Sequence, residues 1–202
     1  IGLINDMLDL SRLEENRKPD RVPVDLRNVA DEVAETLMPL ASEKHIDLTV
    51  TGNASVMAEK EHMTELIKNL AENGIRYNNA GGSVRVTLSD TADGAVIDVR
   101  DNGIGIEEKY QSRLFERFYR VSKSRSRETG GTGLGLAITS HIIRSMNGNI
   151  ELESEYGKGT TFTITFLQKI VDNAPVGAIE DWYRYQVRRP RQYLEQYEAE
   201  DV

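Results

Sequence analysis

The chain has 202 residues, of which 39% are hydrophobic and 29% charged, enough to bury one good core with an appendage but not two full domains. It contains no cysteine, which excludes disulfides and thiolate metal sites, and its net charge of -8 argues against a broad nucleic-acid-binding face. No apolar run approaches the roughly 20 residues needed to cross a bilayer, so we expect no membrane insertion of this chain.

Residues 1–16 predict an amphipathic helix, because apolar residues from Ile1 to Leu13 recur at helical spacing. The chain opens inside this helix without a methionine, so we expect it to be part of a longer protein in which membrane segments could come first. Pro19 and Pro23 break the helix, and residues 19–24 are predicted to form a linker.

The region from residue 25 to residue 169 alternates between helical and strand patterns. Apolar spacing predicts helices over 25–42, 60–78 and 134–146. Alternation predicts strands at 46–51, 84–88, 97–99, 150–154 and 160–167, with hairpin turns at Asp93-Gly94 and at 156–159. The expected fold is an α/β two-layer sandwich, with helices on one face of a mixed, mostly antiparallel sheet.

The last segment, residues 170–202, differs in composition and holds the only tryptophan, Trp182. Its aromatic residues recur at helical spacing, and Pro190 stands where a helix can begin. Two interpretations stay open. The segment forms helices that pack back on the domain, which we favour, or it is an appendage that binds a partner.

Two glycine-rich segments, residues 101–106 and 130–136, indicate a ligand that carries phosphate. Glycine has no Cβ, so its backbone can approach a ligand closely and aim successive N–H groups at phosphate oxygens. The second segment runs into the helix predicted over 134–146. A helix N-terminus favours an anion through its dipole and unpaired N–H groups. The pair therefore predicts a nucleotide site.

Two amides and a guanidinium share one face of the helix predicted over 60–78. Asn69, Asn73 and Arg76 lie beside its apolar stripe and can orient a hydrated Mg²⁺ and the phosphates that it bridges. The alternative is a solvated polar face. Glu72 can polarise an attacking nucleophile, or it can be solvated as well.

A basic stretch, residues 117–127, lies between the two glycine segments in an otherwise acidic chain. Either it closes over phosphates as a lid or it is a solvated loop. For Phe115 and Phe118, packing in the core is compatible with a role in anchoring such a lid.

Five motifs resemble, in the same order, the boxes of sensor histidine kinases of two-component systems. Residues 65–77 are similar to the N box, 101–106 to the G1 box, 114–120 to the F box, 131–136 to the G2 box, and 157–162 to the closing glycine-threonine element. Residues 118–130 are similar to membrane-bound, phosphate-responsive kinases. The resemblance implies a Bergerat-type catalytic ATP-binding domain over 25–169. It also implies that 1–18 end a dimerisation and phosphoacceptor hairpin, whose second helix residues 6–14 resemble.

The resemblance implies ATP and Mg²⁺ as ligands and gives individual residues roles. Asp101 would accept a hydrogen bond from the adenine amino group, and Thr160 would complete the adenine pocket. Asn73 would bind Mg²⁺ with support from Asn69. The implied catalytic residues are Glu72, Asn73 and Arg120; the other implied ATP-binding residues are Arg76, Tyr77, Gly103, Gly105, Ile106, Tyr119, Lys123, Arg125, Gly131, Thr132, Gly133, Leu134, Gly135 and Leu136.

The implied activity is transfer of the ATP γ-phosphoryl group to a histidine of the hairpin, for onward transfer to an aspartate of a response regulator. The full-length protein would be a homodimer that is anchored in the membrane and keeps this domain in the cytoplasm. None of His45, His62 and His141 lies in an acceptor motif, so the chain is expected to bind ATP without labelling itself efficiently.

Two alternatives to this activity stay open. One is an inactive, ATP-dependent regulatory module of the same fold. The other is an ATPase like gyrase or the mismatch-repair proteins, in which a carboxylate occupies the position of Asn69. Gly74 also departs from the family pattern, which has alanine there, and predicts a looser helix.

Overall fold

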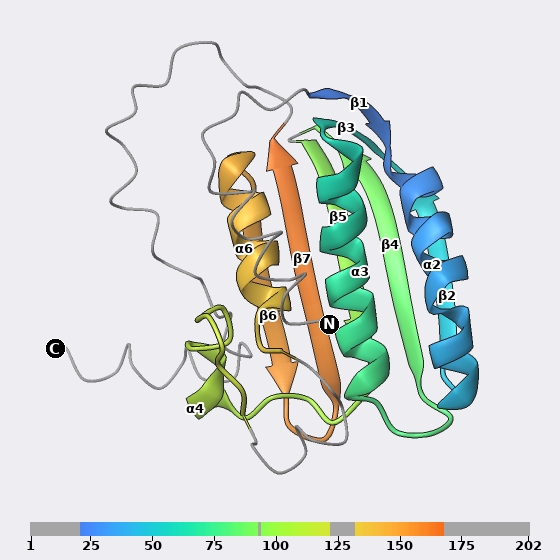
Figure 1. Ribbon diagram of the computed structural model, residues 1–202, viewed down its shortest axis with the longest axis vertical. Coiled ribbons are helices and arrows are strands. Elements are labelled where there is room, and N and C mark those ends of the chain that lie inside the picture. The colour runs from blue at the N-terminus through green and yellow to red at the C-terminus, as the bar shows by residue number, and fades with distance from the viewer. Residues whose placement is uncertain (1–20, 93, 122–131, 168–202) are drawn as a thin grey trace, which may run out of the picture.

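The computed structural model describes residues 21–92, 94–121 and 132–167. The helix expected near the N-terminus, Asp93 of the expected turn, most of the basic stretch and the expected C-terminal appendage lie outside these ranges. Within them the chain folds into two layers, with helices packed on one face of a sheet (Figure 1).

The main sheet has five strands in the order β2-β4-β5-β7-β6. β2 (Asp47–Asn53) runs parallel to β4 (Ser83–Thr91), whereas β5 (Gly94–Asp101), β7 (Gly159–Leu167) and β6 (Asn149–Glu155) continue the sheet with antiparallel pairing. The predicted mixed, mostly antiparallel sheet is confirmed. β7 lies between β5 and β6, so the sheet can bring the end of β5 next to the hairpin that joins β6 and β7.

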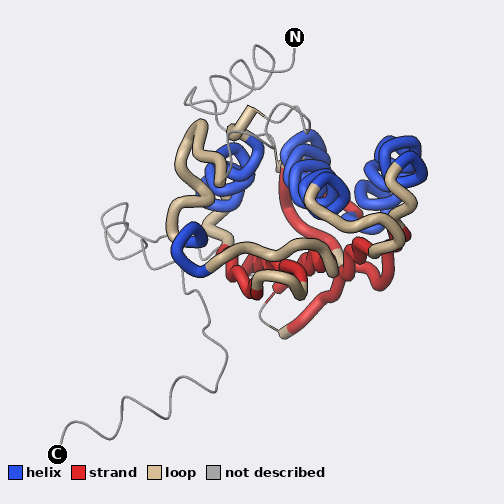
Figure 2. The backbone as a smooth tube through the Cα atoms, turned by 90° about the horizontal axis from the view of Figure 1, so that it is seen from below, coloured by secondary structure: helices blue, strands red, loops and turns tan. Residues whose placement is uncertain are grey.

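Three helices cover one face of this sheet: α2 (Leu26–Glu43), α3 (Lys60–Arg76) and α6 (Gly135–Ser145). Figure 2 shows them on one side of the strands, with no described helix on the other. Alternate strand residues and one stripe of each helix build the core. Its fully buried members include Leu26, Leu66, Leu70, Ile97, Ile138, Ile142 and Ile164. The apolar spacing of the sequence arises from this one-sided packing.

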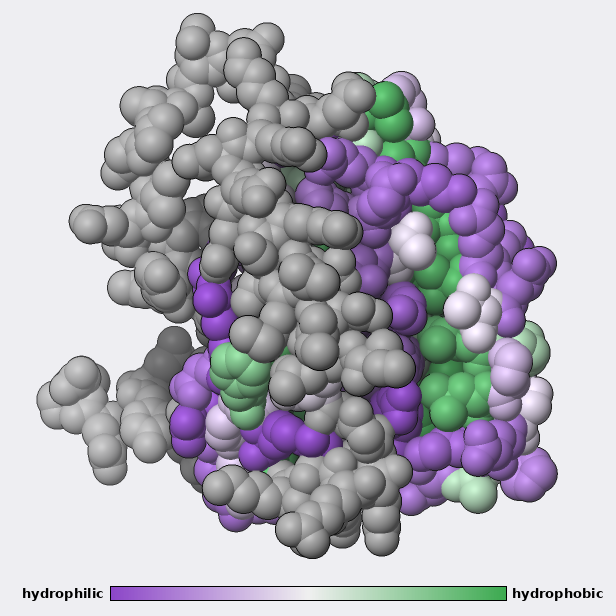
Figure 3. Space-filling model, in the orientation of Figure 1, coloured by the Kyte–Doolittle hydropathy of each residue, from purple (hydrophilic) through white to green (hydrophobic). Residues whose placement is uncertain are grey.

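The helix side of the molecule is mostly hydrophilic where the structure describes it. A hydrophobic strip runs between α2 and α3 (Figure 3). It follows the line along which the apolar faces of the two helices meet. The hydrophobic core therefore extends to α2 at the edge of the sheet. No helix in the described ranges is long and apolar enough to cross a membrane.

A second, two-stranded sheet is an element that the sequence patterns did not predict. β1 (Val22–Asp25) pairs antiparallel with β3 (Ser55–Ala58). β1 therefore takes up residues that were assigned to a linker, and Val24 in it is only 5% exposed. The strand escaped prediction because it is four residues long and contains Pro23, which a short edge strand tolerates because one side of it needs no ladder hydrogen bond.

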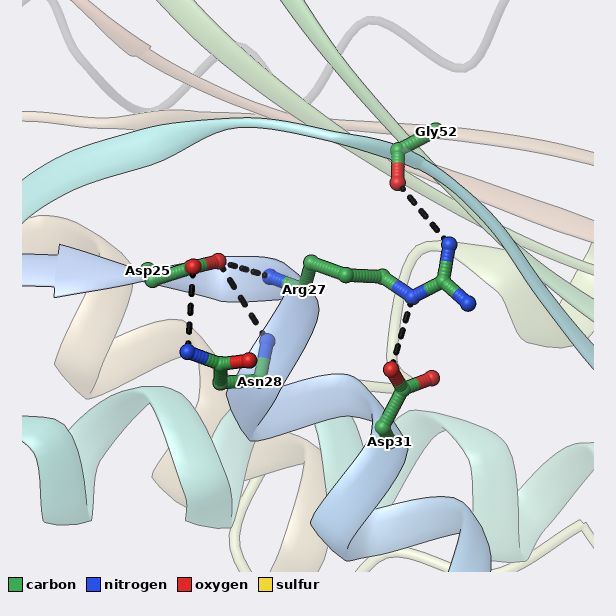
Figure 4. Close-up of polar contacts among 5 residues, drawn as sticks. All are labelled: Asp25, Arg27, Asn28, Asp31 and Gly52. Atoms are coloured by element: carbon green, nitrogen blue, oxygen red, sulfur yellow. Dashed lines mark hydrogen bonds and ion pairs between the residues drawn. The ribbon is translucent and has the colours of Figure 1, made fainter.

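Asp25 ends β1 and caps α2. Its Oδ1 accepts hydrogen bonds from the backbone N–H groups of Arg27 (2.9 Å) and Asn28 (3.3 Å), and its Oδ2 accepts from Asn28 Nδ2 (3.0 Å) (Figure 4). These bonds satisfy N–H groups that have no partner inside the helix. Nearby, Arg27 pairs with Asp31 at 2.8 Å in an exposed ion pair on the same helix.

The cap predicts a difference between two aspartates that are six residues apart on the chain. Asp25→Ala removes the cap and should lower the free energy of unfolding by about 1 kcal/mol. Asp31→Ala removes only the exposed pair with Arg27 and should lower it by less than about 0.5 kcal/mol. Urea unfolding of the two variants measures the difference, and equal losses would contradict a capping role for Asp25.

Candidate functional site

The residues singled out by the sequence gather at one end of the sheet, the lower end in Figure 1. The C-terminal end of α3, the end of β5, the hairpin between β6 and β7 and the N-terminal end of α6 meet there. The short helix α4 (Glu108–Gln111), which the sequence patterns did not predict, lies beside them. Segments far apart in sequence are thus brought to one place.

Three polar residues form the last row of the sheet on its helix-covered face. Asp101 on β5 is opposite Thr160 on β7, and Thr160 is opposite Ser154 on β6. The neighbouring row on the same face is apolar, with Val99, Phe162 and Leu152 in register. The polar row therefore lies where the core ends, and it brings the predicted residues Asp101 and Thr160 together.

The carboxylate of Asp101 uses one oxygen for the fold. Its Oδ1 accepts hydrogen bonds from the backbone N–H groups of Gly103 (2.8 Å) and Thr160 (3.3 Å). Its Oδ2 has no hydrogen-bond partner among the described residues. Burial raises the pKa of Asp101, and the two N–H groups partly oppose that rise. One acceptor oxygen thus remains for a ligand.

Ser154 and Gln111 tie the first glycine segment to the sheet, and sequence reasoning missed both. Ile106 N donates to Ser154 Oγ at 2.9 Å, and Gln111 Nε2 donates to Ile106 O at 2.8 Å and to Ser154 O at 3.0 Å. Gln111 is only 5% exposed. A glutamine in a run of polar residues carries no signal of burial, because only the packing of α4 against β6 encloses it.

The two asparagines of α3 have different surroundings. Asn69 Nδ2 donates to Glu65 Oε1 at 3.2 Å and to the carbonyl oxygen of Gly135, the first residue of α6, at 3.3 Å. The half-buried side chain of Asn73 makes no hydrogen bond within the described part of the chain. Asn69 therefore joins α3 to α6, while the Asn73 amide stays available to a ligand.

Glu72 and Arg76 contact each other instead of facing the site as separate charges. Arg76 Nε donates to Glu72 Oε1 at 2.7 Å, and the side chains are 30% exposed for Arg76 and 24% for Glu72. Tyr77 follows Arg76 as the C-cap of α3, and its carbonyl oxygen accepts from Ile104 N at 3.0 Å. The pair orients the guanidinium, and the cap attaches α3 to the first glycine segment.

The second glycine segment leads into α6 as expected. Leu134 is fully buried at the N-cap of α6, and its N–H donates to Thr132 Oγ1 at 3.3 Å. The carbonyl oxygen of Gly133 accepts a hydrogen bond from Phe118 N at 3.0 Å, which joins the second glycine segment to the start of the basic stretch. Leu136 packs partly buried against the core. The first turn of α6 has no side-chain cap, so its N–H groups can meet an anion.

The basic stretch is described only in part. Phe115 packs edge-on against Phe162, with ring centroids 6.5 Å apart, whereas Phe118 is 55% exposed. Tyr119 lies half-buried under the guanidinium of Arg113, at 4.4 Å from the ring centroid, and Arg120 next to it is half-buried. The remaining candidates, Lys123, Arg125 and Gly131, lie outside the described residues.

Gly74 owes its place to close packing. A Cβ on this residue would lie 3.1 Å from a methyl group of Val84 and 3.4 Å from the Cβ of Asp101. α3 therefore approaches the sheet more closely at the polar row than an alanine would allow without a small shift. An alanine at this position would require the Val84 methyl groups to move by a few tenths of an ångström.

Gly105 makes a sharp prediction, because it has φ +62 and a Cβ there would meet the carbonyl oxygen of Glu155 at 2.0 Å. Gly157 is the matched control, since it has φ +86 with open space around the Cβ position. Gly157→Ala should lose about 1 to 2 kcal/mol of unfolding free energy from its backbone conformation alone. Gly105→Ala should lose clearly more, as measured by urea unfolding. Equal losses would mean that the loop moves away from Glu155 without resistance.

Comparison with known proteins agrees with this geometry. Residues 58–170 match the family model described as histidine kinase-, DNA gyrase B-, and HSP90-like ATPase. The chain is similar to the sensor histidine kinase RppB of Synechocystis sp., with 43% identity over 80% of this chain and 37% of that protein. It is similar to the phosphate regulon sensor protein PhoR of Pseudomonas aeruginosa, with 35% identity over 82% of this chain and 38% of that protein.

Among solved structures, full-length ShkA in complex with AMPPNP matches with a TM-score of 0.70 and 29% identity, over 81% of this chain and 34% of that one. The chain thus spans well under half the length of these relatives. The matched family model covers the polar row, α3 and the start of α6. The chain belongs to the family of histidine kinase-, DNA gyrase B- and HSP90-like ATPases, as the catalytic domain of a sensor histidine kinase.

Proposed function

We propose that this domain binds Mg-ATP and transfers the γ-phosphoryl group to a histidine of a dimerisation hairpin that lies outside the described residues. The observation that carries the proposal is the single acceptor oxygen left on Asp101, at one end of a site whose other end is the uncapped N-terminus of α6. A nucleotide offers a donor amino group at one end and anionic phosphates at the other. That polarity fits the site.

At the base end, Asp101 Oδ2 would accept from the adenine amino group, and Thr160 would complete the pocket. Gly103, Gly105 and Ile106 would let the first glycine segment line the base. The fit has a steric basis, because a Cβ on Gly103 would meet the carbonyl oxygen of Tyr77 at 2.5 Å. A Cβ has no room at this distance from backbone, so the close approach requires glycine.

At the phosphate end, the amide of Asn73 fits a hard cation, because amide oxygens are suitable ligands for Mg²⁺. Bound there, Mg²⁺ would supply neutralisation of the phosphate charge. Asn69 would hold α6 in place while Thr132, Gly133, Leu134, Gly135 and Leu136 present backbone groups to the phosphates. Arg76 and Arg120 would add positive charge, and Tyr77 and Tyr119 would add contacts to the nucleotide. Lys123, Arg125 and Gly131 lie outside the described residues, and for them the proposal rests on the resemblance alone. For Glu72 to polarise a nucleophile, its pair with Arg76 would have to open.

The substrate histidine belongs to another part of the protein in this proposal. His62 lies in the first turn of α3 and pairs with Glu59 at 3.0 Å, and His45 lies exposed at a left-handed turn with φ 55. Neither has the acceptor motif around it. Residues 1–18 would end the hairpin, and a response regulator would take the phosphoryl group from it. The domain would work in the cytoplasm, where ATP is available, as part of a membrane-anchored homodimer.

Phosphotransfer to a separate hairpin tests the proposal. The chain is mixed with Mg-ATP and a folded hairpin from the longer protein that carries the acceptor histidine, and phosphohistidine is measured. Asn73→Ala should lower the rate roughly 100-fold or more, the size of effect seen when one electrostatic contact to the reacting group is removed. Asn53→Ala, an exposed asparagine at the end of β2, is the control and should leave the rate unchanged.

Two results would count against kinase activity. Binding of ATP without transfer to the docked hairpin would indicate a regulatory module of the same fold. Release of inorganic phosphate at a comparable rate without any hairpin would indicate an ATPase.

The ionised carboxylate of Asp101 should lower the stability of the fold and raise the affinity for ADP. Its raised pKa means that the folded state holds a proton more tightly than the unfolded state, so stability falls as the pH rises through the folded pKa. Asp101→Asn removes this loss, and its stability relative to the unchanged protein should increase from about pH 4 to about pH 7. Affinity for ADP should fall roughly 10- to 100-fold, because a hydrogen bond to a charged acceptor is lost.

Asp98→Asn is the matched control, on the same strand but the opposite face, where Asp98 accepts from Thr163 Oγ1 at 2.6 Å. It should leave ADP affinity unchanged. Urea unfolding at the two pH values and calorimetric titration with ADP measure both effects. Equal ADP affinity of Asp101→Asn and the unchanged protein would remove Asp101 from the site.

A further inference from the structure

The hydroxyl group of Ser154 lies at the centre of three contacts. Ile106 N donates to Ser154 Oγ at 2.9 Å, Gly159 O lies 3.0 Å from it, and Thr160 Oγ1 lies 3.0 Å from it. A serine hydroxyl has one proton to donate and two lone pairs that accept. Three contacts therefore use its full capacity.

The chemical nature of the three partners decides where the protons lie. Gly159 O is a carbonyl oxygen and only accepts, so the Ser154 proton goes to it. Ile106 N–H takes one lone pair of Ser154 Oγ. For the third contact to be a hydrogen bond as well, Thr160 must donate its own proton to the remaining lone pair of Ser154. The Thr160 hydroxyl is then left with lone pairs alone.

This arrangement determines what the polar row can offer to a ligand. Thr160 is in register with Asp101, whose Oδ2 has no partner among the residues described. An ionised carboxylate oxygen also only accepts. The two neighbours therefore both accept hydrogen bonds, and neither has a proton to give.

We propose that Ser154 sets the base selectivity of the site, by taking the proton of Thr160 and so leaving a pair of acceptors beside the base. The inference rests on the proposed adenine site at Asp101. A 6-amino purine has two N–H donors for this pair, whereas a 6-oxo purine turns a carbonyl oxygen toward it. An unpaired acceptor facing acceptors is disfavoured, and the site discriminates by that difference.

Gln111 acts as a positioning residue for the hydrogen bonds of Ser154. Its side-chain amide donates both protons, one to Ile106 O and one to Ser154 O. It thereby holds the N–H of Ile106 and the hydroxyl of Ser154 within bonding distance. The buried amide links the first glycine segment to β6. It thereby keeps Ile106 N–H and Thr160 as donors to the Ser154 hydroxyl.

Calorimetric titration of this chain with ADP and with IDP, in the presence of Mg²⁺, tests the proposal. IDP differs from ADP in the 6-oxo group and the proton on N1. Ser154→Ala frees the Thr160 proton, which can then be donated to the 6-oxo group. The ratio of the dissociation constants, IDP over ADP, should fall roughly 3- to 10-fold, the value of one neutral hydrogen bond.

A double-mutant cycle sharpens the test. Thr160→Val removes the acceptor itself and should lower the ratio by a similar factor, and Ser154→Ala combined with Thr160→Val should lower it no further than either change alone. Ser154→Cys, which fills the site with a slightly larger side chain that accepts poorly, should lower the ratio as well and replaces the alanine variant if that variant does not fold. Thr163→Val, a hydroxyl deletion on the opposite face of β7, should leave the ratio unchanged.

The outcomes separate this inference from the function on which it rests. A ratio that stays unchanged in Ser154→Ala, with both affinities reduced equally, would assign Ser154 a purely structural role and overturn the inference alone. Full additivity with Thr160→Val would do the same. Failure of the unchanged protein to bind ADP would overturn the proposed function, and the inference with it.

Discussion

The structure depends on the register of β7 between β5 and β6. This register places Asp101, Thr160 and Ser154 side by side at the end of the helix-covered face. A slip of β7 by one residue would turn Thr160 away from Asp101 and Ser154, and it would carry Phe162 and Ile164 of the same strand out of the core. Because those rows are buried under α3 and α6, the core itself holds the polar row in place. Packing far from the site thus fixes the geometry of the site.

The polar row is tolerated at the edge of a core because nearly all of its hydrogen-bonding capacity is used. Backbone N–H groups donate to Asp101 and Ser154, and the Gln111 amide donates to backbone carbonyl oxygens. No buried side-chain polar atom among the described residues is left without a partner. The outer oxygen of Asp101 and the remaining lone pairs of Thr160 are not used within the described residues, and burial raises the pKa of the Asp101 carboxyl. An imperfectly satisfied group in an otherwise complete network is costly to the fold, and this cost is the usual sign of a binding residue.

The two ends of the site are built on different principles. The base end consists of side chains in sheet register, held by short-range hydrogen bonds. The other end consists of backbone at the start of α6, and Asn69 joins it to α3 through Gly135. α3 contacts both ends, through Gly74 beside Asp101 and through Asn69. The position of this helix on the sheet therefore sets the distance between the two ends.

The sequence by itself determined the three long helices, the strands of the main sheet and the two glycine segments, because apolar periodicity and glycine are local signals of backbone geometry. It also determined the family, since five motifs in one order leave few alternatives. It did not reveal β1, whose four residues include Pro23, or the burial of Gln111 in a polar run. Nor did it show the pairing of Glu72 with Arg76 or the place of Ser154 in the polar row. These features depend on which strands become neighbours and how α3 and α4 pack on them, and contacts between residues distant in the chain exist only once the tertiary structure has formed.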